Sequence, residues 1–369
     1  MIQANMHLKH LTCVMAGIMM MAACEKNPEG PSGQKPEPQE PEQTETVFAK
    51  GADISWVTQM EADGQKFYSQ DGRETECTAL MKELGFNAIR LRVWVNPEGG
   101  WCGSEDVLVK ARRAQALGMR IMIDFHYSDT WADPSKQVVP AAWSGYGTDA
   151  LTEAVAAHTG EVLQLLKDNG VEVEWVQIGN EINDGMLHPH GKLSDPQKIG
   201  NFTGFFNAGS AAARRIYPDI KVVLHRSNGH ETTAFEWLLD TMKYKNLDYD
   251  IIGMSLYPTW WENGGWRSWK SAAEACMANI AAFHKKYGKP VIICEIGMPV
   301  SEPEMSQEAL RYVLENTSES QDCQGVFYWE PQTDGVWKPS SYAALGWNAY
   351  DKGAFHNGKA TSALDPFKE

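Results

Sequence analysis

The chain has 369 residues, 43% hydrophobic and 22% charged, so it is long enough to bury a full core without disulfides or metal ions. Its 48 acidic and 33 basic residues give a formal net charge of −15. This charge argues against a nucleic-acid partner and against electrostatic docking on anionic lipid, because both need clustered basic residues. The 14 Trp residues are unusual, because indole faces are costly to expose unless they pack in a core or meet a ligand.

The N-terminal segment is predicted to be a targeting signal followed by a tether. An apolar run over 11–23 is too short to span a bilayer and ends Met-Ala-Ala-Cys, which resembles a bacterial lipobox. Residues 1–23 are therefore predicted to be a lipoprotein signal peptide, with Cys24 as the lipid-bearing residue. An ordinary signal peptide with an incidental cysteine is the alternative. Residues 24–46 are rich in Pro, Glu and Gln and predict a disordered, lipid-anchored tether.

From residue 47 to 369, short apolar runs alternate with amphipathic stretches. The runs predict strands near 48–56, 87–95, 120–126, 173–180, 221–226, 251–257, 290–296 and 325–330. The stretches between them predict helices near 74–84, 107–117, 150–169, 198–217, 233–244, 271–287 and 307–316. Several of these helices run into a glycine, which adopts the left-handed conformation of a helix end at low cost. They are Gly85, Gly118, Gly170 and Gly288.

This alternation predicts an α/β fold, a single (β/α)8 TIM barrel that forms one catalytic domain over 47–369. A doubly wound open sheet is the alternative. No GxGxxG or GxxxxGK[ST] motif follows a predicted strand, so nucleotide binding has no support. Five cysteines remain beyond Cys13 and Cys24, without the spacing of a zinc site. One disulfide stays open, and Cys294 is predicted to be a small buried residue in a strand.

Two predicted strands each end in a glutamate. The fourth ends Gly-Asn-Glu at Glu181, and the seventh ends Cys-Glu-Ile-Gly with Glu295. Catalytic groups of such barrels lie at the C-terminal ends of strands, and two carboxylates there suit glycoside hydrolysis, with one as acid and one as nucleophile. Either glutamate alone reads as a helix-capping or surface residue. Together with Asn180 and the number of strands, they predict a catalytic pair.

Further polar residues point into the predicted barrel. Arg90 and Arg92 alternate onto one face of the second strand, where a carboxylate at the barrel mouth would pair with them, although surface arginines are the alternative. Asp124 and His126 share a face of the third strand. A metal centre there lacks a third ligand at a recognisable spacing, so hydrogen bonding to sugar hydroxyls and catalytic groups is preferred.

The remaining strand ends contribute aromatic and polar groups. His225 ends the fifth strand, and Tyr257 at the end of the sixth is placed to donate a hydrogen bond to Glu295. Trp329 ends the eighth and offers a face for a pyranose ring. Trp175 and Trp237 are predicted to lie in the core. Six other indoles are predicted to line a cleft: Trp131, Trp260, Trp261, Trp266, Trp269 and Trp337.

These strings together resemble glycoside hydrolase family 53, the endo-β-1,4-galactanases of a large retaining barrel clan. The motifs are Gly-Ala-Asp-Ile-Ser at 51–55, the Arg90-containing strand, the string 124–134, Gly-Asn-Glu at 179–181 and Tyr-Trp-Glu-Pro at 328–331. The Asn-Glu pair marks only the clan, whereas the string 124–134 singles out the family. The resemblance covers most of the chain after the tether.

The resemblance implies that Glu181 is the acid/base and Glu295 the nucleophile, and that Asn180 binds the 2-hydroxyl of the sugar. It implies that Arg90 and Tyr257 hold Glu295. Six further residues would shape the subsites: Asp53, Arg92, Asp124, His126, His225 and Trp329.

The resemblance also implies a partner and a location. The substrate would be galactan or type I arabinogalactan, cut internally with retention. The resemblance implies that no cofactor is required. Bacterial relatives of the family, however, often carry a calcium ion in long loops after the last two strands. Those loops look short here, which argues against calcium and suggests an open cleft. Met298 replaces the aromatic residue that usually follows the glycine after the nucleophile. A monomer on the outer-membrane surface, attached only by its lipid, is expected.

Two rival functions remain. One is another retaining endo-glycanase of the clan, acting on mannan, glucan or xylan. The other is a surface glycan-binding protein, which needs aromatic platforms but has no use for paired carboxylates at strand ends.

Overall fold

The strands form a closed barrel. The computed structural model describes residues 47–259 and 268–369, and within these ranges eight parallel strands close in the order β1-β10-β9-β8-β7-β4-β3-β2. The closed order confirms the (β/α)8 prediction and excludes the open-sheet alternative. The strands are β1 (Ala49–Asp53), β2 (Ala88–Val93), β3 (Arg120–Phe125), β4 (Trp175–Ile178), β7 (Lys221–Arg226), β8 (Ile251–Leu256), β9 (Val291–Ile296) and β10 (Cys323–Trp329).

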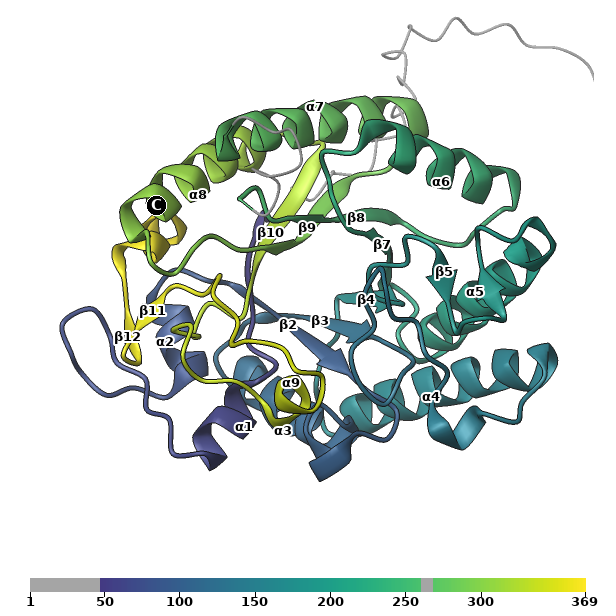
Figure 1. Ribbon diagram of the computed structural model, residues 1–369, viewed down its shortest axis with the longest axis horizontal. Coiled ribbons are helices and arrows are strands. Elements are labelled where there is room, and N and C mark those ends of the chain that lie inside the picture. Colours follow the sequence, from purple (N-terminus) through teal and green to yellow (C-terminus); the bar gives the residue numbers. More distant parts are fainter. Residues whose placement is uncertain (1–46, 260–267) are drawn as a thin grey trace, which may run out of the picture. The chain divides into compact units, whose positions relative to one another are not determined.

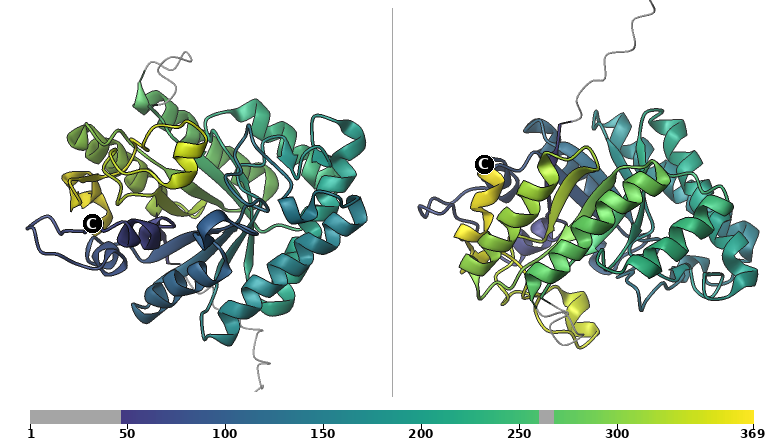
Figure 2. Two further views of the ribbon diagram at one scale, coloured as in Figure 1. Left: turned by 60° about the horizontal axis from the view of Figure 1, so that its bottom comes forward. Right: turned by 90° about the horizontal axis from the view of Figure 1, so that it is seen from above.

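Helices surround the barrel, as Figures 1 and 2 show. Those that follow the first seven strands are α2 (Cys77–Glu83), α3 (Ser104–Ala116), α4 (Thr148–Asp168), α5 (Ile199–Ile216), α6 (Thr232–Tyr244), α7 (Trp269–Tyr287) and α8 (Pro303–Ser318). Each of the four predicted helix-ending glycines has a positive φ, between 65° and 95°. A side chain would strain the backbone there, which explains where these helices end.

Several short elements decorate the barrel and were not predicted. Helix α1 (Val57–Ala62) follows β1, and helix α9 (Ser340–Ala344) follows β10. Two small hairpins, β5–β6 (Gly185–Met186 and Gly191–Lys192) and β11–β12 (Phe355–His356 and Lys359–Ala360), also lie in loops. They are too short to give a periodic sequence pattern, which is why the sequence did not reveal them.

The barrel interior is apolar toward the N-terminal ends of the strands. Trp175 and Phe327 meet there with ring centroids 6.0 Å apart, and both are fully buried, which confirms the core prediction for Trp175. The core prediction for Trp237 is wrong, because 47% of its side chain is exposed. On α6, Phe235, Leu238 and Leu239 face the barrel, and helical periodicity leaves position 237 on the opposite face.

Strand β9 carries an irregularity that matters for the site. In its pairing with β8, Met254 lies opposite Ile293, but the next residue, Ser255, lies opposite Glu295. This shift is a β-bulge at Cys294, which packs in the inner apolar cluster. Strict alternation would turn the residue after Cys294 outward. The bulge instead turns Glu295 inward as well, so that it reaches the barrel mouth.

Some predictions fall outside the described residues: the signal peptide, the tether, Cys24, and the indoles of Trp260, Trp261 and Trp266. Within the described ranges, the five cysteines are all buried and unpaired, including Cys294. Across the same ranges, no helix combines the length and the apolar character that crossing a bilayer would require.

Candidate active site

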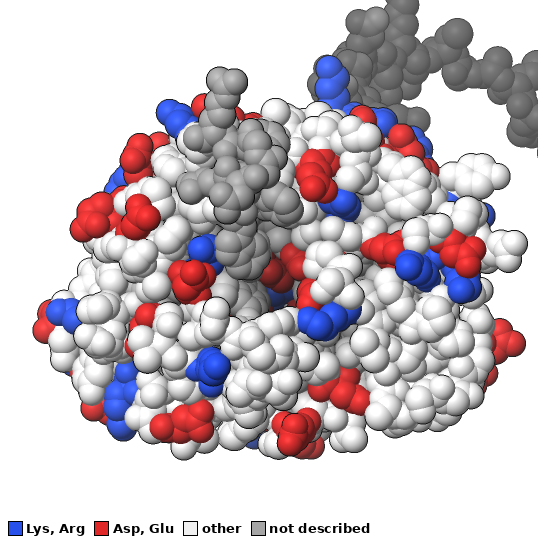
Figure 3. All heavy atoms as spheres, in the orientation of Figure 1, with Lys and Arg blue, Asp and Glu red and all other residues white. Residues whose placement is uncertain are grey.

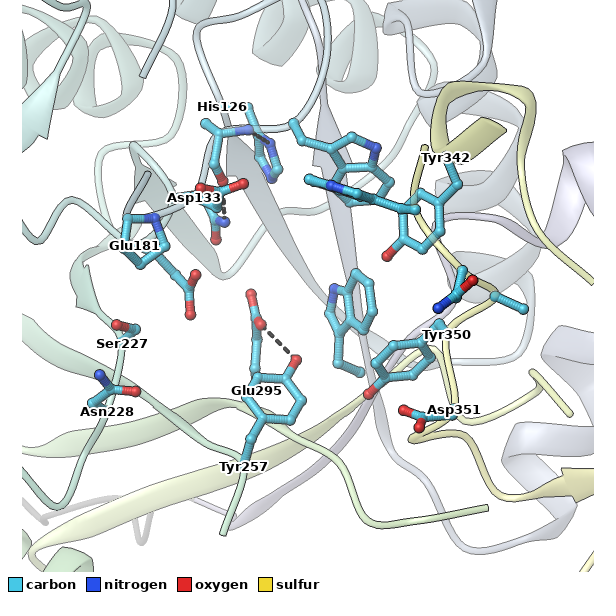
Figure 4. Close-up of a pocket in the computed structure, with 18 residues that line it drawn as sticks. His126, Asp133, Glu181, Ser227, Asn228, Tyr257, Glu295, Tyr342, Tyr350 and Asp351 are labelled. Carbon is cyan, nitrogen blue, oxygen red and sulfur yellow. Dashed lines mark hydrogen bonds between the residues drawn. The ribbon is translucent and has the colours of Figure 1, made fainter. Parts of the chain in front are cut away.

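A pocket of about 500 Å³ opens at the C-terminal ends of the strands. Figure 4 shows carboxylates near its middle and aromatic rings along one side. On the face drawn in Figure 3, acidic and basic side chains are interspersed rather than gathered by sign. The pocket is lined by His126, Trp131, Ala132, Asp133, Pro134, Asn180, Glu181, Ser227, Asn228, Tyr257, Glu295, Trp329, Tyr342, Trp347, Asn348, Ala349, Tyr350 and Asp351.

Glu181 and Glu295 meet in this pocket. A carboxylate oxygen of each lies within 4.8 Å of the other and of a ring nitrogen of His225. Glu181 follows β4 through a tight turn, in which Gly179 has φ 82° and Glu181 itself φ 43°. Left-handed backbone at a non-glycine residue is uncommon and collects at functional sites. The turn directs the Glu181 carboxylate toward the carboxylate of Glu295, which the β9 bulge turns inward.

Arg90 is the central cation beneath the pocket. Its guanidinium is buried and lies 2.7 Å from Asp53, 2.9 Å from Asp124 and 3.1 Å from Glu295. It also donates to Asn180 Oδ1 at 2.9 Å. These contacts confirm that the arginine faces inward and is paired with carboxylates. Because Glu295 also accepts a hydrogen bond from Tyr257 at 2.8 Å, its two oxygens have separate partners, as predicted for Tyr257.

Asp124 and His126 belong to the same polar layer. His126 Nδ1 accepts hydrogen bonds from the indole of Trp94 and the backbone of Ala132, so its proton lies on Nε2, which donates to Asp124 at 3.0 Å. The other oxygen of Asp124 accepts from Gln177 at 2.6 Å. Arg90, His126 and Gln177 thus all contact the Asp124 carboxylate and hold it within a hydrogen-bond network.

A relay of hydrogen bonds ends at Glu181. Gln177 donates to His225 Nδ1 at 2.8 Å, His225 Nε2 donates to Ser255 Oγ at 2.9 Å, and Ser255 donates to Glu181 at 2.7 Å. Burial and the charge of Arg90 hold the pKa of His225 well below its usual value, so the ring is neutral. Gln177 and Ser255 were not predicted as site residues. Their polar side chains in otherwise apolar strands were the available signal.

The environments of the two glutamates differ. Burial, and then the negative charge of Glu295, raise the pKa of Glu181 to about 8. Burial raises the pKa of Glu295 to about 7, which stays below that of Glu181 because Arg90 and the Tyr257 hydroxyl stabilise the charged form of Glu295. Two carboxyl groups this close do not both ionise readily. The charge therefore resides on Glu295, and the proton on Glu181.

Arg92 is buried behind the pocket and is not among the residues that line it. Its guanidinium donates to Glu330 at 2.6 Å and stacks on the ring of Trp131 at 4.5 Å. Trp56 and Trp329 also face it, at 5.1 and 6.0 Å. The ion pair satisfies the predicted need for a carboxylate, but the carboxylate is that of Glu330. Arg92 supports two indoles that do line the pocket.

The aromatic wall comes largely from the segment after β10. Residues 330–354 supply Tyr342, Trp347 and Tyr350, none of which was predicted. The expectation that the loop after the last strand is short is therefore wrong, because this segment, with helix α9 inside it, forms one side of the pocket. Its sequence lacks any period that would separate a wall from a linker.

The predicted cleft indoles have different positions. Trp131 and Trp329 line the pocket. Trp337 lies outside the lining and donates to Asp63, while packing on the buried ring of Trp56. Trp269 is the first residue of α7, not a loop residue. Asp53 is also absent from the lining, since it contacts Arg90 and Ser55 beneath the pocket.

Within the described ranges, the one group of side chains arranged closely enough to suggest a metal site is Glu181, His225 and Glu295. Both nitrogens of His225 already take part in hydrogen bonds with Gln177 and Ser255. Both oxygens of Glu295 have partners in Arg90 and Tyr257. This group is better suited to proton transfer than to metal ligation.

Comparison with known proteins places this geometry among enzymes. Residues 49–367 match the model of Glycosyl hydrolase family 53. The chain is 31% identical to an endo-β-1,4-galactanase of Bacillus subtilis (strain 168), covering 85% of this chain and 80% of that protein. It is 32% identical to an arabinogalactan endo-β-1,4-galactanase A of Emericella nidulans, covering 76% and 84%.

Solved structures of galactanases and of a GH53 catalytic domain also superpose on this chain. A structure of fungal β-1,4-galactanases superposes with a TM-score of 0.75 at 28% identity, covering 87% of this chain and 99% of that one. The GH53 catalytic domain of Ignisphaera aggregans superposes with a TM-score of 0.76 at 28% identity, covering 90% and 98%. An intracellular xylanase of Thermoanaerobacterium saccharolyticum, at 15% identity and a TM-score of 0.57, shares the fold alone.

Proposed function

The chain belongs to glycosyl hydrolase family 53, and from this premise we propose that it hydrolyses internal β-1,4-galactosidic bonds of galactan and type I arabinogalactan. The alignments with the galactanase relatives cover most of those proteins and most of this chain. The xylanase structure, at 15% identity, indicates the fold alone. A glycan-binding protein would have no use for two carboxylates with separated proton affinities.

The proposed reaction is a double displacement. The Glu295 carboxylate attacks the anomeric carbon, and the bond to the leaving oxygen breaks as Glu181 transfers its proton to that oxygen. Glu181, now ionised, then takes a proton from water. The resulting hydroxide equivalent attacks the same carbon and releases Glu295. Each half of the reaction inverts the carbon, so the product keeps the β configuration.

The separation of the two carboxylates carries this assignment. Retaining enzymes hold their carboxyl groups about 5–5.5 Å apart, whereas inverting enzymes leave about 6.5–9.5 Å for a water molecule. The oxygens of Glu181 and Glu295 approach within 4.8 Å, a spacing that suits direct attack by a carboxylate and is shorter than the separation that inverting enzymes use. Arg90 and Tyr257 support the role of Glu295 as nucleophile, because both stabilise the ionised carboxylate.

The substrate assignment is tested with purified polysaccharides. Linear β-1,4-galactan is expected to lose viscosity early, while reducing ends are still few, because internal cuts shorten the polymer fastest. Mannan, xylan and β-glucan are the controls. Cleavage of one of these but not of galactan would contradict the substrate and leave the mechanism standing.

The pH profile of kcat/KM on galacto-oligosaccharides is expected to be bell-shaped. Activity needs Glu295 ionised and Glu181 protonated, so it falls as pH drops through the pKa of Glu295 and as pH rises through that of Glu181, near 8. Ser255 donates to Glu181 and favours its charged form, thereby lowering that pKa. Ser255→Ala is therefore expected to move the alkaline limb to higher pH.

A matched control for this shift is Ser210→Ala. Ser210, on α5, also donates a hydrogen bond to a carboxylate, that of Asp248. Asp248 lies just before the N-terminal end of β8, which is the end away from the pocket. Its removal is expected to leave the alkaline limb in place. An alkaline limb that Ser255→Ala leaves unchanged or moves to lower pH would contradict the assignment of that limb to Glu181.

For the rest of the protein we propose the arrangement expected from the sequence. Cys24 would carry the lipid that holds a monomeric catalytic barrel at the outer-membrane surface, with residues 24–46 as the tether. The Met-Ala-Ala-Cys sequence and the Pro- and Glu-rich segment support this proposal. No cofactor enters the mechanism, since side chains supply both the proton and the nucleophile. Metabolic labelling with a fatty-acid probe, compared between wild type and Cys24→Ala, tests the anchor.

A further inference from the structure

The loop after β7 forms a rigid polar corner beside Glu181. The Ser227 backbone N–H donates to Asn183 Oδ1 at 2.9 Å, and Asn183 Nδ2 donates to Ser227 Oγ at 2.7 Å. Gly229 N–H donates to the carbonyl of Ser255 at 2.8 Å, which ties the loop to β8. The corner is thus fixed to the segment that carries Glu181 and to the strand whose serine contacts Glu181.

Two atoms of this corner retain hydrogen-bonding capacity toward the pocket. Ser227 Oγ accepts from Asn183, so its own proton is available to a ligand. Asn228 donates through Nδ2 to Glu231 at 3.2 Å, while its Oδ1 accepts no hydrogen bond from the described residues. Asn228 is half-buried and lines the pocket with φ 59°. A left-handed backbone conformation held by neighbouring contacts presents this amide to the pocket.

The position of the corner fixes which part of a substrate it meets. Figure 4 places Ser227 and Asn228 beside Glu181, on the opposite side of Glu295 from Tyr342 and Tyr350. Glu181 protonates the leaving oxygen, so the leaving sugar lies on the Glu181 side of the cleaved bond. The aromatic wall then faces the sugars that stay attached to Glu295.

We propose that Ser227 and Asn228 form part of the subsite for the leaving galactosyl residue and bind its hydroxyls by hydrogen bonds. The inference rests on the proposed galactanase function and its assignment of Glu181 and Glu295. Among the described lining residues, the corner contributes an amide and a hydroxyl, whereas Tyr342 and Tyr350 lie across the pocket from it. Sugar hydroxyls are both donors and acceptors, which these two side chains complement.

The same subsite governs the fate of the covalent intermediate. A second galactoside bound there can replace water: its hydroxyl oxygen bonds to the anomeric carbon, the bond to Glu295 breaks, and the proton passes to Glu181. The products are a longer oligosaccharide and the free enzyme. The ratio of transfer to hydrolysis therefore reports binding at the leaving-group subsite, independently of the first chemical step.

The test uses Asn228→Gly, which removes the amide and tolerates the positive φ. Its kcat/KM on galactotetraose is expected to fall about tenfold more than on a nitrophenyl β-galactobioside, whose leaving group has no sugar hydroxyls. The ratio of transfer to hydrolysis, with galactobiose added as acceptor, is expected to fall as well. Ser227→Ala is the second variant and carries the same comparison if Asn228→Gly does not fold.

The matched control is Asn246→Gly. Asn246 follows the other end of α6, is exposed, and has φ 53°, so it undergoes the same substitution in the same backbone conformation away from the pocket. It is expected to change neither the ratio of kcat/KM on the two substrates nor the ratio of transfer to hydrolysis. Equal loss on both substrates in Asn228→Gly, or no change in either ratio, would overturn the subsite. A wild-type enzyme that cleaves neither galactotetraose nor galactan would instead overturn the proposed function.

Discussion

Replacing Glu295 with glutamine is expected to lower kcat on galactan by about 10⁶-fold, the scale seen when a covalent nucleophile is removed. An amide cannot form the glycosyl ester, so the loss should appear equally on galactan and on nitrophenyl β-galactobioside. Gln fits the same volume and keeps an oxygen for Arg90 or Tyr257. The melting temperature is therefore expected to stay close to that of the wild type.

The control for this substitution is Glu174→Gln. Glu174 lies just before β4, at the opposite end of the barrel from the pocket, and forms an ion pair with Arg120. The control substitution therefore also removes a carboxylate from an arginine pair. Its activity is expected to equal that of the wild type. A Glu295→Gln enzyme that is folded and keeps more than about a hundredth of wild-type kcat would rule out Glu295 as nucleophile.

Replacing Glu181 with alanine is expected to lower kcat/KM on galactan by about 10³-fold, within the usual range for loss of a general acid. The loss on nitrophenyl β-galactobioside should be smaller, because nitrophenolate leaves without a proton. The second step also needs Glu181, as the base that activates water. Azide, which needs no base, is expected to restore turnover on the aryl substrate and to give a β-galactosyl azide.

This rescue separates the two glutamates. Azide is not expected to yield a β-product with Glu295→Gln, because that enzyme lacks the nucleophile that forms the intermediate. If Glu181→Ala lost the same factor on both substrates and azide had no effect, Glu181 would not be the acid/base. Wild type with azide serves as the reference for any direct effect of the salt.

The sequence predicted the barrel and the residues at its mouth because both depend on local patterns. Alternating apolar and amphipathic segments encode strands and helices, and parallel strands bring their C-terminal ends to one rim. Strand alternation placed Arg90 inside, and the structure confirms its contact with Glu295. The hydrogen bond from Tyr257 to Glu295 followed from the neighbouring positions of β8 and β9.

Other parts of the site depend on contacts that no local pattern records. Alternation alone would have separated Cys294 from Glu295, and only the strand pairing reveals the bulge that turns both inward. Arg92 was predicted to face inward, but its partner Glu330 comes from a distant strand end. The aromatic residues of 330–354 reach the pocket through an irregular path. The exposure of Trp237 shows that an apolar residue in a helix is buried only if it falls on the inner face.

The central claim is that Glu181 and Glu295 act as a retaining pair. It is tested most directly by following the hydrolysis of galactotetraose by ¹H NMR from the first minutes, before the reducing ends mutarotate. With the carboxylate oxygens within 4.8 Å of each other, the β-anomer is expected to form first. First appearance of the α-anomer would show single displacement by water and contradict both the covalent intermediate and the assigned roles.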